Sequence, residues 1–272
     1  KVIGTSPIRH DGVDKVTGAA KYGADTQLTG MLHGRVLRSA HAHARIRSID
    51  TSKAEALPGV FAVCTSKDFP IIEDQIIDLS EAQGTARLMA EHVLANEKAL
   101  YKGHALAAVA AVNAHVAEEA INLIEVDYEV LPTVLTLHDA LKDDAPILHE
   151  DLTTMFRVER FVRGEDTGVK GNIAAHLQHK LGDIEKGFAE ADVIIEREFD
   201  TETVHQGYIE PHASTAVWSK DGRLTIWTCT QGAFAIRSSC AAILDLPESA
   251  VKVVPTEIGG GFGAKITTYL EP

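Results

Sequence analysis

The sequence contains few cysteines and fewer basic than acidic residues. Its 272 residues include three cysteines, and no two of them form a Cys-x-x-Cys pair. Three widely spaced cysteines exclude a four-cysteine iron–sulfur site and argue against a disulfide-stabilised scaffold. A cytoplasmic location is therefore expected. Lysine and arginine together number 26 against 39 aspartates and glutamates, which gives a formal net charge of -13. That balance argues against nucleic acid or an anionic membrane surface as the main partner.

Long apolar runs and nucleotide-binding signatures are also missing. No apolar run approaches membrane-spanning length, and the first residues show no secretory signal, so we expect no membrane span. The glycine-rich stretch at residues 259–263 has neither the spacing of a dinucleotide fingerprint nor the Gly-Lys-Ser/Thr ending of a phosphate loop. With 45% hydrophobic and 24% charged residues, the composition is that of a globular protein. The length allows one large domain or two ordinary ones.

The first half of the chain has the pattern of an α+β domain. Residues 104–112 form a continuous apolar run, which predicts a buried strand. Asn113 can cap the helix that follows this strand. Apolar residues alternate at positions 126, 128 and 130 and predict the next strand. Strand, helix and strand in this order indicate an α+β domain, and we expect it to have a packing role.

The chain then changes character. Charged and turn-forming residues at 135–171 indicate a linker between two domains. Asp183 has the position of a helix cap, and the mixed alternation at 193–204 predicts a long strand. An Asp221-Gly222 turn between two strand-like segments predicts a hairpin.

The most informative pattern is a pair of expected strands at 223–228 and 251–254, with a helix between them. The helix has apolar residues on one face, at Ile236, Cys240, Ile243 and Leu244. If the strands are parallel neighbours, they form a βαβ unit with a right-handed crossover. Gln231 and the loop at 259–263 then lie at the carboxyl end of the strands, where open α/β sheets bind ligands. An amide beside free backbone N–H groups suits an anion or a polarised oxygen. A satisfied turn amide is the alternative for Gln231.

Two groups of histidines and acids need a separate interpretation. His41 and His43 share one face of an expected strand, so a metal pair is conceivable. No third ligand is near them in the sequence, and we favour a structural or surface role. His205, Glu210 and His212 have no recognised metal-binding spacing. For this second group we expect buried hydrogen bonds that hold the neighbouring loops.

Several motifs occur in the order in which they occur in the molybdenum-binding subunit of the xanthine dehydrogenase/aldehyde oxidase family, which the sequence resembles over almost its whole length. They lie at residues 14–18, 37–46, 118–120, 206–212, 230–231 and 258–265. The resemblance implies an α+β fold, with an α/β-hammerhead domain at residues 1–134 and a linker at 135–171. The first part of a mixed α+β molybdopterin-binding domain, incomplete in this sequence, is expected at 172–272.

The resemblance also implies an activity, which is the oxidation of a small-molecule substrate with oxygen taken from water. Molybdenum is expected on a molybdopterin cofactor in a dinucleotide form. By the same resemblance, the bound cofactor would supply the oxygen-transfer and redox chemistry, with either a sulfido or an oxo ligand on the metal. Electrons then leave through 2Fe-2S clusters to FAD. The sequence has no iron–sulfur cysteine set and no flavin motif, so an iron–sulfur subunit and an FAD subunit are expected as partners.

The site residues follow from the same resemblance. Gln231 would be the catalytic residue, because its side-chain amide would donate to a ligand of the molybdenum. Gly260, Gly261, Phe262 and Gly263 would place backbone N–H groups against the metal site and the pterin pyrophosphate. Gln231 and Phe262 are therefore expected close to the metal without coordinating it. The physical basis is donation to developing negative charge, with a close backbone approach that glycine permits.

Two features depart from the family pattern. Molybdenum subunits of the family usually continue well beyond the glycine loop and carry the essential glutamate base there. We therefore expect a fragment or a split subunit that needs the remainder of the molybdenum subunit for catalysis. Ile266 stands where xanthine-acting members have an acidic residue, which favours an aldehyde, carbon monoxide or an aromatic heterocycle as substrate. The alternatives are a non-catalytic assembly subunit without cofactor and a nucleotide-binding module that holds phosphate in the glycine loop.

Overall fold

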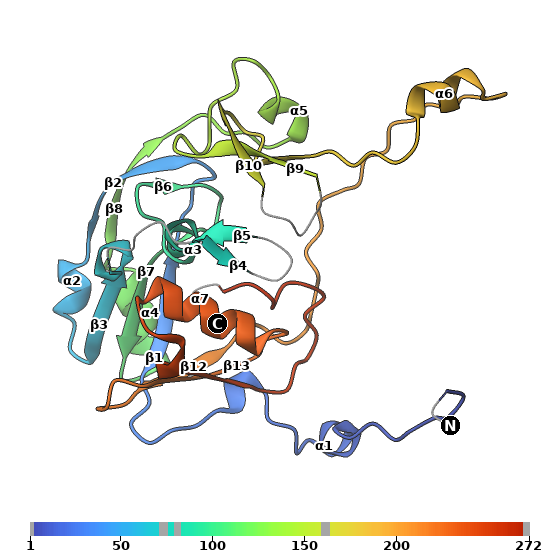
Figure 1. The fold of residues 1–272 in the computed structure, drawn as a ribbon. Helices are drawn as coiled ribbons and strands as arrows, with labels where there is room; N and C mark the ends of the chain where they lie inside the picture. Colours follow the sequence, from blue (N-terminus) through green and yellow to red (C-terminus); the bar gives the residue numbers. More distant parts are fainter. Residues whose placement is uncertain (1–2, 71–75, 79–82, 159–163, 269–272) are drawn as a thin grey trace. The chain divides into compact units, whose positions relative to one another are not determined.

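The structure is a computed structural model that describes residues 3–70, 76–78, 83–158 and 164–268 (Figure 1). Its contacts divide the chain into two compact units. The first comprises residues 1–77, 84–130 and 206–272, and the second comprises residues 78–83 and 131–205. Helices and strands are present in both units, which confirms the α+β class.

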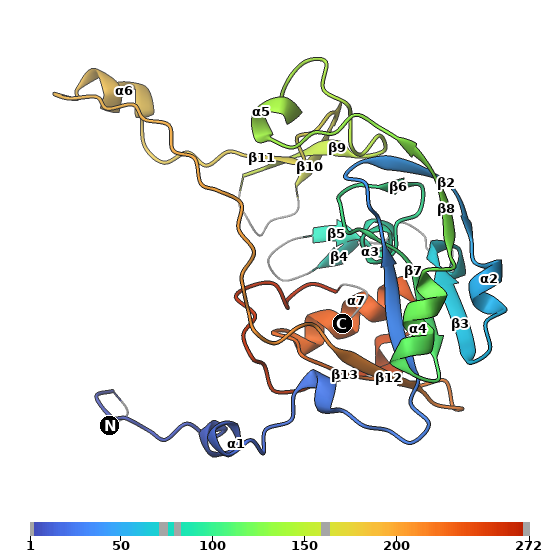
Figure 2. The ribbon, with the colours of Figure 1, turned by 180° about the vertical axis from the view of Figure 1, so that it is seen from behind.

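The first unit contains an antiparallel sheet whose central strand is buried on both faces. Its strands, in order, are β1 (His33–Arg38), β7 (Ala105–Ala111) and β3 (Val60–Thr65). Side chains alternate between the two faces of a strand. Val109 packs in one apolar cluster with Ala117 of helix α4 (Ala114–Ile121), and Leu106 packs in another. Figure 2 shows α4 lying against β1. The continuous apolar run thus forms the buried strand that the sequence predicts.

Helix α4 begins at the predicted residue. The side-chain oxygen of Asn113 accepts a 2.9 Å hydrogen bond from the N–H of Val116. A cap of this kind stabilises a helix by about 1 kcal/mol. After α4 the chain enters β8 (Glu125–Val130), which confirms the strand predicted there.

A second antiparallel sheet of the first unit covers the Leu106 face of β7. Its strands, in order, are β6 (Lys98–Ala99), β2 (Ala44–Asp50) and β8. Ile46 of β2 and Tyr128 of β8 pack against the cluster that contains Leu106. The smaller elements before β6 are helices α1 (Gly12–Thr17), α2 (Ser52–Glu55) and α3 (Ala86–Val93), 3-10 turns at Gly23–Asp25 and Ser66–Asp68, and the paired strands β4 (Ile76–Asp78) and β5 (Gln83–Thr85).

A third sheet of the first unit contains the predicted βαβ arrangement. Its strands, in order, are β12 (Ser214–Trp218), β13 (Leu224–Thr228) and β14 (Val251–Pro255). β12 and β13 form the predicted hairpin around Gly222, whose φ is 82°. β13 and β14 are parallel, and helix α7 (Ala233–Ile243) connects them, followed by a 3-10 turn at Glu248–Ala250. Ile236 and Cys240 of α7 are buried against this sheet, as their helical spacing predicts.

The second unit includes residues 135–171, for which the sequence predicts a linker. Residues 135–171 are not irregular throughout, because they contain helix α5 (Leu137–Ala140) and strands β9 (Thr153–Arg157) and β10 (Glu165–Lys170). β10 pairs with β9 in antiparallel fashion, and β11 (Ala175–Leu177) pairs with β9 in parallel fashion. The charged composition suggested a linker because these strands are short and bury little apolar surface.

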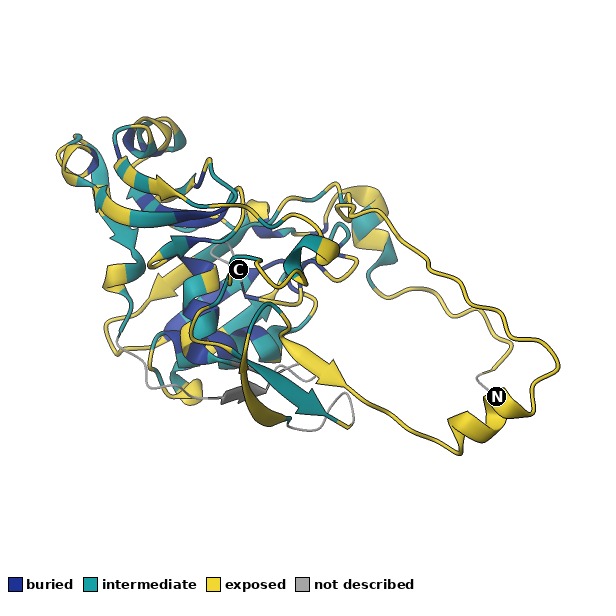
Figure 3. Ribbon diagram, turned by 90° about the horizontal axis from the view of Figure 1, so that it is seen from above, coloured by how far each residue is buried: buried dark blue, intermediate teal, exposed yellow. Residues whose placement is uncertain are grey.

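The segment after this sheet gives one confirmation and one correction. The Asp183 carboxylate accepts a 3.0 Å hydrogen bond from the N–H of Lys186 and so caps helix α6 (Ile184–Ala189), as predicted. The strand predicted at 193–204 is wrong, since the structure shows no strand there. A strand needs a hydrogen-bonded neighbour, and no described residue pairs with this segment. Its apolar side chains, including those of Ile195 and Phe199, are exposed, whereas buried residues gather in the sheets and helices of the first unit (Figure 3). Among the described helices, none combines the length and the apolar character needed to cross a bilayer.

Candidate functional site

Two loops meet at the carboxyl ends of β13 and β14, where the sequence predicts a site. Thr228 at the end of β13 lies opposite Pro255 at the end of β14. Beyond these residues, the backbone N–H of Gln231 donates a 2.8 Å hydrogen bond to the carbonyl oxygen of Lys265. The hydroxyl of Thr230 donates to the same oxygen over 3.1 Å. Gln231 and the glycine loop therefore converge, as expected.

The amide of Gln231 has a defined orientation. Its Oε1 accepts hydrogen bonds from the N–H of Gly263 at 3.1 Å and from the N–H of Lys265 at 3.3 Å. A backbone N–H can only donate, so the atom that faces both groups must be the amide oxygen. Among the described residues, the Gln231 side-chain nitrogen has no hydrogen-bond partner. Since Gln231 is exposed, this nitrogen can donate to a ligand.

Polar side chains lie directly against Gly259 and Gly261. A Cβ on Gly261 would lie 2.5 Å from Oε1 of Gln231, and a Cβ on Gly259 would lie 2.7 Å from Cβ of Glu210. Both distances are too short for a real side chain. Because neither glycine has a side chain, Glu210 can pack against Gly259 and Gln231 can pack against Gly261.

The middle of the loop has an unusual backbone. Gly260 and Gly263 have φ of 101° and 92°, and Phe262 has φ of 51° with a side chain that is 73% exposed. A positive φ is uncommon for a bulky residue and often marks a functional site. Among the described residues, the backbone N–H groups of Gly260, Gly261 and Phe262 have no hydrogen-bond partner. Three neighbouring donors suit an anion or a polarised oxygen.

Gly263 has a hydrogen bond within the site, and its predicted contact with the cofactor stays a prediction. The resemblance implies that its N–H faces the cofactor, but this N–H is used in the hydrogen bond to Gln231. Gly263 thus orients the amide, and Gly260, Gly261 and Phe262 supply the free N–H groups. Sequence reasoning missed this because the hydrogen bond joins residues that are 32 positions apart.

A buried ion pair supports both loops. The Lys265 ammonium lies 2.6 Å from Oε2 of Glu210, with side-chain exposures of 0% and 12%. The same carboxylate oxygen accepts a 2.7 Å hydrogen bond from the N–H of Gly259. The predicted role of Glu210 in holding the neighbouring loops is confirmed. The part played by the Lys265 side chain was missed, because a lysine in a polar loop is normally exposed.

The N-terminal segment also holds the base of the glycine loop. Tyr22 and Glu257 form a parallel β-bridge, in which the N–H of Glu257 donates to the carbonyl of Lys21 over 3.0 Å. Lys15 forms an ion pair of 2.9 Å with the Glu257 carboxylate. These contacts fix the chain just before residue 259.

The structure does not bring the histidines singled out in the sequence into a metal site. The His41 ring stands edge-on to Tyr128, with 4.9 Å between the ring centroids. His212 packs in a similar way on Tyr208 at 5.5 Å. Among the described residues, neither residue belongs to a group of three potential ligands. The structural role favoured for these histidines agrees with the ring contacts.

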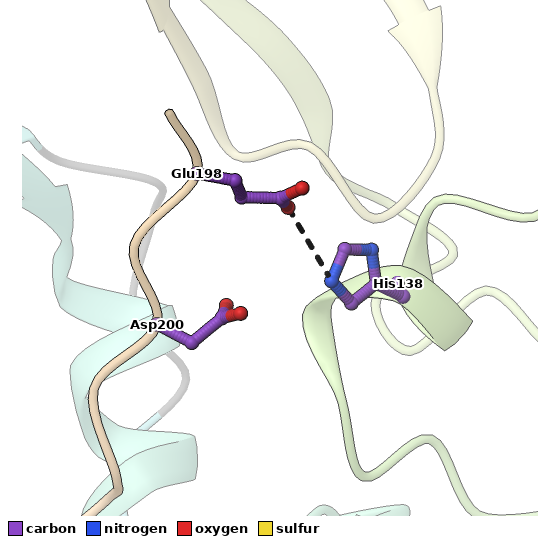
Figure 4. A group of neighbouring side chains, drawn as sticks. All are labelled: His138, Glu198 and Asp200. Atoms are coloured by element: carbon purple, nitrogen blue, oxygen red, sulfur yellow. Dashed lines mark ion pairs between the residues drawn. The ribbon is translucent and has the colours of Figure 1, made fainter. Parts of the chain in front are cut away.

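A different histidine does lie near two carboxylates, in the second unit (Figure 4). The ligand atoms of His138, Glu198 and Asp200 lie within 4.8 Å of one another, and the ion pair between His138 and Glu198 measures 4.0 Å. All three residues are exposed. Exposed acids beside a histidine are common on protein surfaces, and no buried group or preorganised hydrogen bond supports this cluster. We assign it no role.

Comparison with known families matches both parts of the chain. Residues 17–132 match the family described as aldehyde oxidase and xanthine dehydrogenase, a/b hammerhead domain, and residues 166–272 match the molybdopterin cofactor-binding domain. The fold and the site thus define a homologue of molybdopterin-dependent oxidoreductase large subunits.

Individual relatives agree with these matches. The carbon monoxide dehydrogenase large chain of Afipia carboxidovorans is 38% identical over 93% of this chain and 30% of its own length. A probable xanthine dehydrogenase subunit of Bacillus subtilis is 35% identical over 98% of this chain and 32% of its own length. Among solved structures, Cu,Mo-CO dehydrogenase gives a TM-score of 0.77 at 35% identity over 98% of this chain and 33% of its own.

The chain therefore belongs to the molybdenum hydroxylase family that includes xanthine dehydrogenase and carbon monoxide dehydrogenase. It consists of the hammerhead domain and a portion of the molybdopterin-binding domain of a large subunit. The chain spans about a third of the length of these two relatives from Afipia and Bacillus. A further relative is named as subunit gamma of the 6-hydroxypseudooxynicotine dehydrogenase complex, in keeping with a family of multi-subunit enzymes.

Proposed function

We propose that this chain forms one wall of a molybdopterin site, in an enzyme that oxidises a small molecule with oxygen from water. The observation that carries the proposal is the orientation of Gln231, whose amide oxygen is held by the N–H groups of Gly263 and Lys265. The amide nitrogen is thereby left as a fixed donor at the rim of the sheet. A preorganised donor of this kind stabilises negative charge as it develops during a reaction.

The residues present fit such a cofactor. A pterin pyrophosphate offers acceptor oxygens, and among the described residues the backbone N–H groups of Gly260, Gly261 and Phe262 have no hydrogen-bond partner. The cofactor would supply the redox chemistry when bound. Gln231 and the loop would bind and orient it, with Gln231 and Phe262 near the metal and Gly263 acting through Gln231.

Other parts of the enzyme belong to the same proposal. The remainder of the molybdenum subunit would supply the general base, and separate iron–sulfur and FAD subunits would accept the electrons. The family matches at 17–132 and 166–272 support a hammerhead domain at 1–134 and a cofactor-binding domain at 172–272. The three cysteines are free, which agrees with a cytoplasmic location.

The substrate class follows from the residue after Lys265. Ile266 is apolar and 39% exposed, so it offers no carboxylate to a polar purine ring. We propose an aldehyde, carbon monoxide or an aromatic heterocycle as the substrate. The relatives named carbon monoxide dehydrogenase and nicotinate dehydrogenase support substrates of this kind, whereas other relatives are named for xanthine or hypoxanthine.

Replacement of Gln231 tests the proposal. In the protein purified with the partners that it retains, Gln231→Ala should lower turnover by about 10²–10³-fold, the loss typical of one preorganised donor. The thermal midpoint should stay close to that of wild type, because Gln231 is exposed. Molybdenum should be present in the wild-type protein by elemental analysis. A protein without molybdenum would instead support the assembly subunit, and unchanged turnover in the variant would remove the role of Gln231.

A further inference from the structure

The Lys265 side chain is unusual because it is a fully buried cation beside the glycine loop. Its side-chain exposure is 0%. Its ammonium donates to Oε2 of Glu210 over 2.6 Å and to the backbone carbonyl of the same residue over 3.1 Å. It also lies 4.9 Å from the centre of the Tyr208 ring, within range of a cation–π interaction. A buried lysine is costly unless it is paired in this way, so its position is tightly fixed.

The backbone of the same residue fixes Gln231. The carbonyl oxygen of Lys265 accepts hydrogen bonds from the N–H of Gln231 and from the hydroxyl of Thr230. Its N–H donates to Oε1 of Gln231. Lys265 thus connects the segment that contains Glu210, the corner that contains Gln231 and the end of the glycine loop.

Glu210 anchors both ends of the loop through one oxygen atom. Its Oε2 accepts from the N–H of Gly259 at the start of the loop and from the Lys265 ammonium at its end. The other oxygen, Oε1, is buried and has no hydrogen-bond partner among the described residues. The carboxylate therefore depends on the Lys265 ammonium for its charge balance, and without it the two loop ends lose their common anchor.

From this arrangement, we propose that Lys265 is a positioning residue, which keeps the nitrogen of the Gln231 amide turned toward the cofactor. Without the buried ammonium, the end of the loop is no longer held against Glu210. The N–H groups of Gly263 and Lys265 then move away from Oε1 of Gln231. An amide that loses both donors can rotate and present its oxygen, which repels the acceptor atoms of a cofactor. The catalytic consequence of this inference rests on the proposed function, while the effect on the loop does not.

Hydrogen exchange tests the effect on the loop directly. Lys265→Met removes the charge and keeps a long side chain. In the purified protein, the hydrogen-bonded amides of Gly259, Gly263 and Lys265 should exchange at least about tenfold faster than in wild type, because their closed state loses its anchor. Peptides that cover β7 should be unchanged. Lys252→Met is the matched control, because Lys252 is exposed on β14, and it should leave exchange in the loop unaltered.

A double-mutant cycle tests whether Lys265 acts through Gln231. Lys265→Met alone should lower kcat by tenfold or more, and it should have little further effect in a Gln231→Ala background, because the amide that it orients is gone. Independent losses that multiply would show that Lys265 does not act through Gln231. Unchanged exchange in the loop of Lys265→Met would overturn the positioning role itself.

A second variant and a molybdenum analysis separate the failure of this inference from a failure to fold and from a failure of the proposed function. If Lys265→Met does not fold, Lys265→Met combined with Glu210→Gln removes both buried charges, a change that proteins often tolerate. This pair should fold, keep the amide of Gly259 protected and lose protection at the end of the loop, whereas protection at both ends would contradict the proposal. If wild-type protein contains no molybdenum, the proposed function fails, and the exchange measurement still decides whether Lys265 positions Gln231.

Discussion

Strand β7 and the glycine loop are both built from very small side chains, but small size has opposite consequences in them. In β7, alanines at 107 and 111 are buried and allow helix α4 to pack closely on the sheet. In the loop at 259–263, missing side chains expose backbone N–H groups and admit the side chains of Glu210 and Gln231. Small residues thus serve close packing in β7, whereas in the loop they leave room for two polar side chains.

The largest effect is expected for Gly261→Ala, which adds a side chain to the glycine loop. The added Cβ would lie 2.5 Å from Oε1 of Gln231, so the amide must leave the N–H groups of Gly263 and Lys265. Turnover should fall by about 10²-fold, approaching the loss in Gln231→Ala. Steady-state kinetics on the purified protein measures this change.

Gly34→Ala is the matched control for this substitution. A Cβ on Gly34, in β1, would meet nothing within 4 Å, and its φ is not positive. Turnover and thermal midpoint should stay close to wild type, since the same substitution adds a methyl group to open space. Equal losses in both variants would mean that the contact with Gln231 has no special importance.

The elements that sequence reasoning predicted are those set by local signals. Asn113 and Asp183 cap their helices through hydrogen bonds to residues three positions later. The Asp221-Gly222 turn and the apolar face of α7 fix the hairpin and the βαβ unit within about forty residues. Gln231 and the glycine loop came together because parallel neighbouring strands end on the same edge.

The parts that were missed depend on distant partners. Residues 193–204 have a strand-like pattern, but a pattern cannot supply the neighbouring strand that a ladder needs. β9 pairs in parallel with β11, and this contact is not visible in the composition of 135–171. In the site, Glu210 and Lys265 are 55 positions apart. Their pairing, like the orientation of the Gln231 amide, follows from the tertiary fold.

Ala117→Leu tests whether small residues in and around β7 are needed for close packing. Ala117 is fully buried in the cluster that contains Val109 and Ala107. A larger side chain would force α4 away from the sheet and lower the free energy of unfolding by ~1–3 kcal/mol. Urea denaturation measures this loss, and the turnover of the protein that remains folded should not change. His115→Leu, at an exposed position of α4, is the control. If it destabilises the protein equally, close packing at Ala117 is not the cause.

The smallest expected effect is a pH dependence of folding stability that arises from His104, at the start of β7. The glycine loop does not contain this histidine. His104 is buried, and burial lowers its pKa below the ordinary value of 6.5, with smaller contributions in the same direction from His92 and Arg38. The ring is neutral and fully used, because Nδ1 accepts from the N–H of Leu100 at 3.2 Å and Nε2 lies 2.9 Å from the carbonyl of Glu91. Protonation of Nδ1 would break the first bond.

The sign of this dependence follows from the two pKa values. As the pH falls through 6.5, the unfolded chain binds a proton at His104 before the folded protein does, so stability is lost toward acid. The slope for this one group is at most ~1.4 kcal/mol per pH unit, and it ends below the lowered pKa of the folded state. Urea midpoints between about pH 8 and pH 5 should therefore fall more steeply for wild type than for His104→Gln, which keeps a donor and an acceptor but does not titrate. Parallel pH profiles would show that His104 does not supply the acid sensitivity. In that case the packing of α4, and not the protonation of His104, would be the main feature on which the stability of β7 depends. The glycine loop would still differ from β7, because it depends on its backbone geometry.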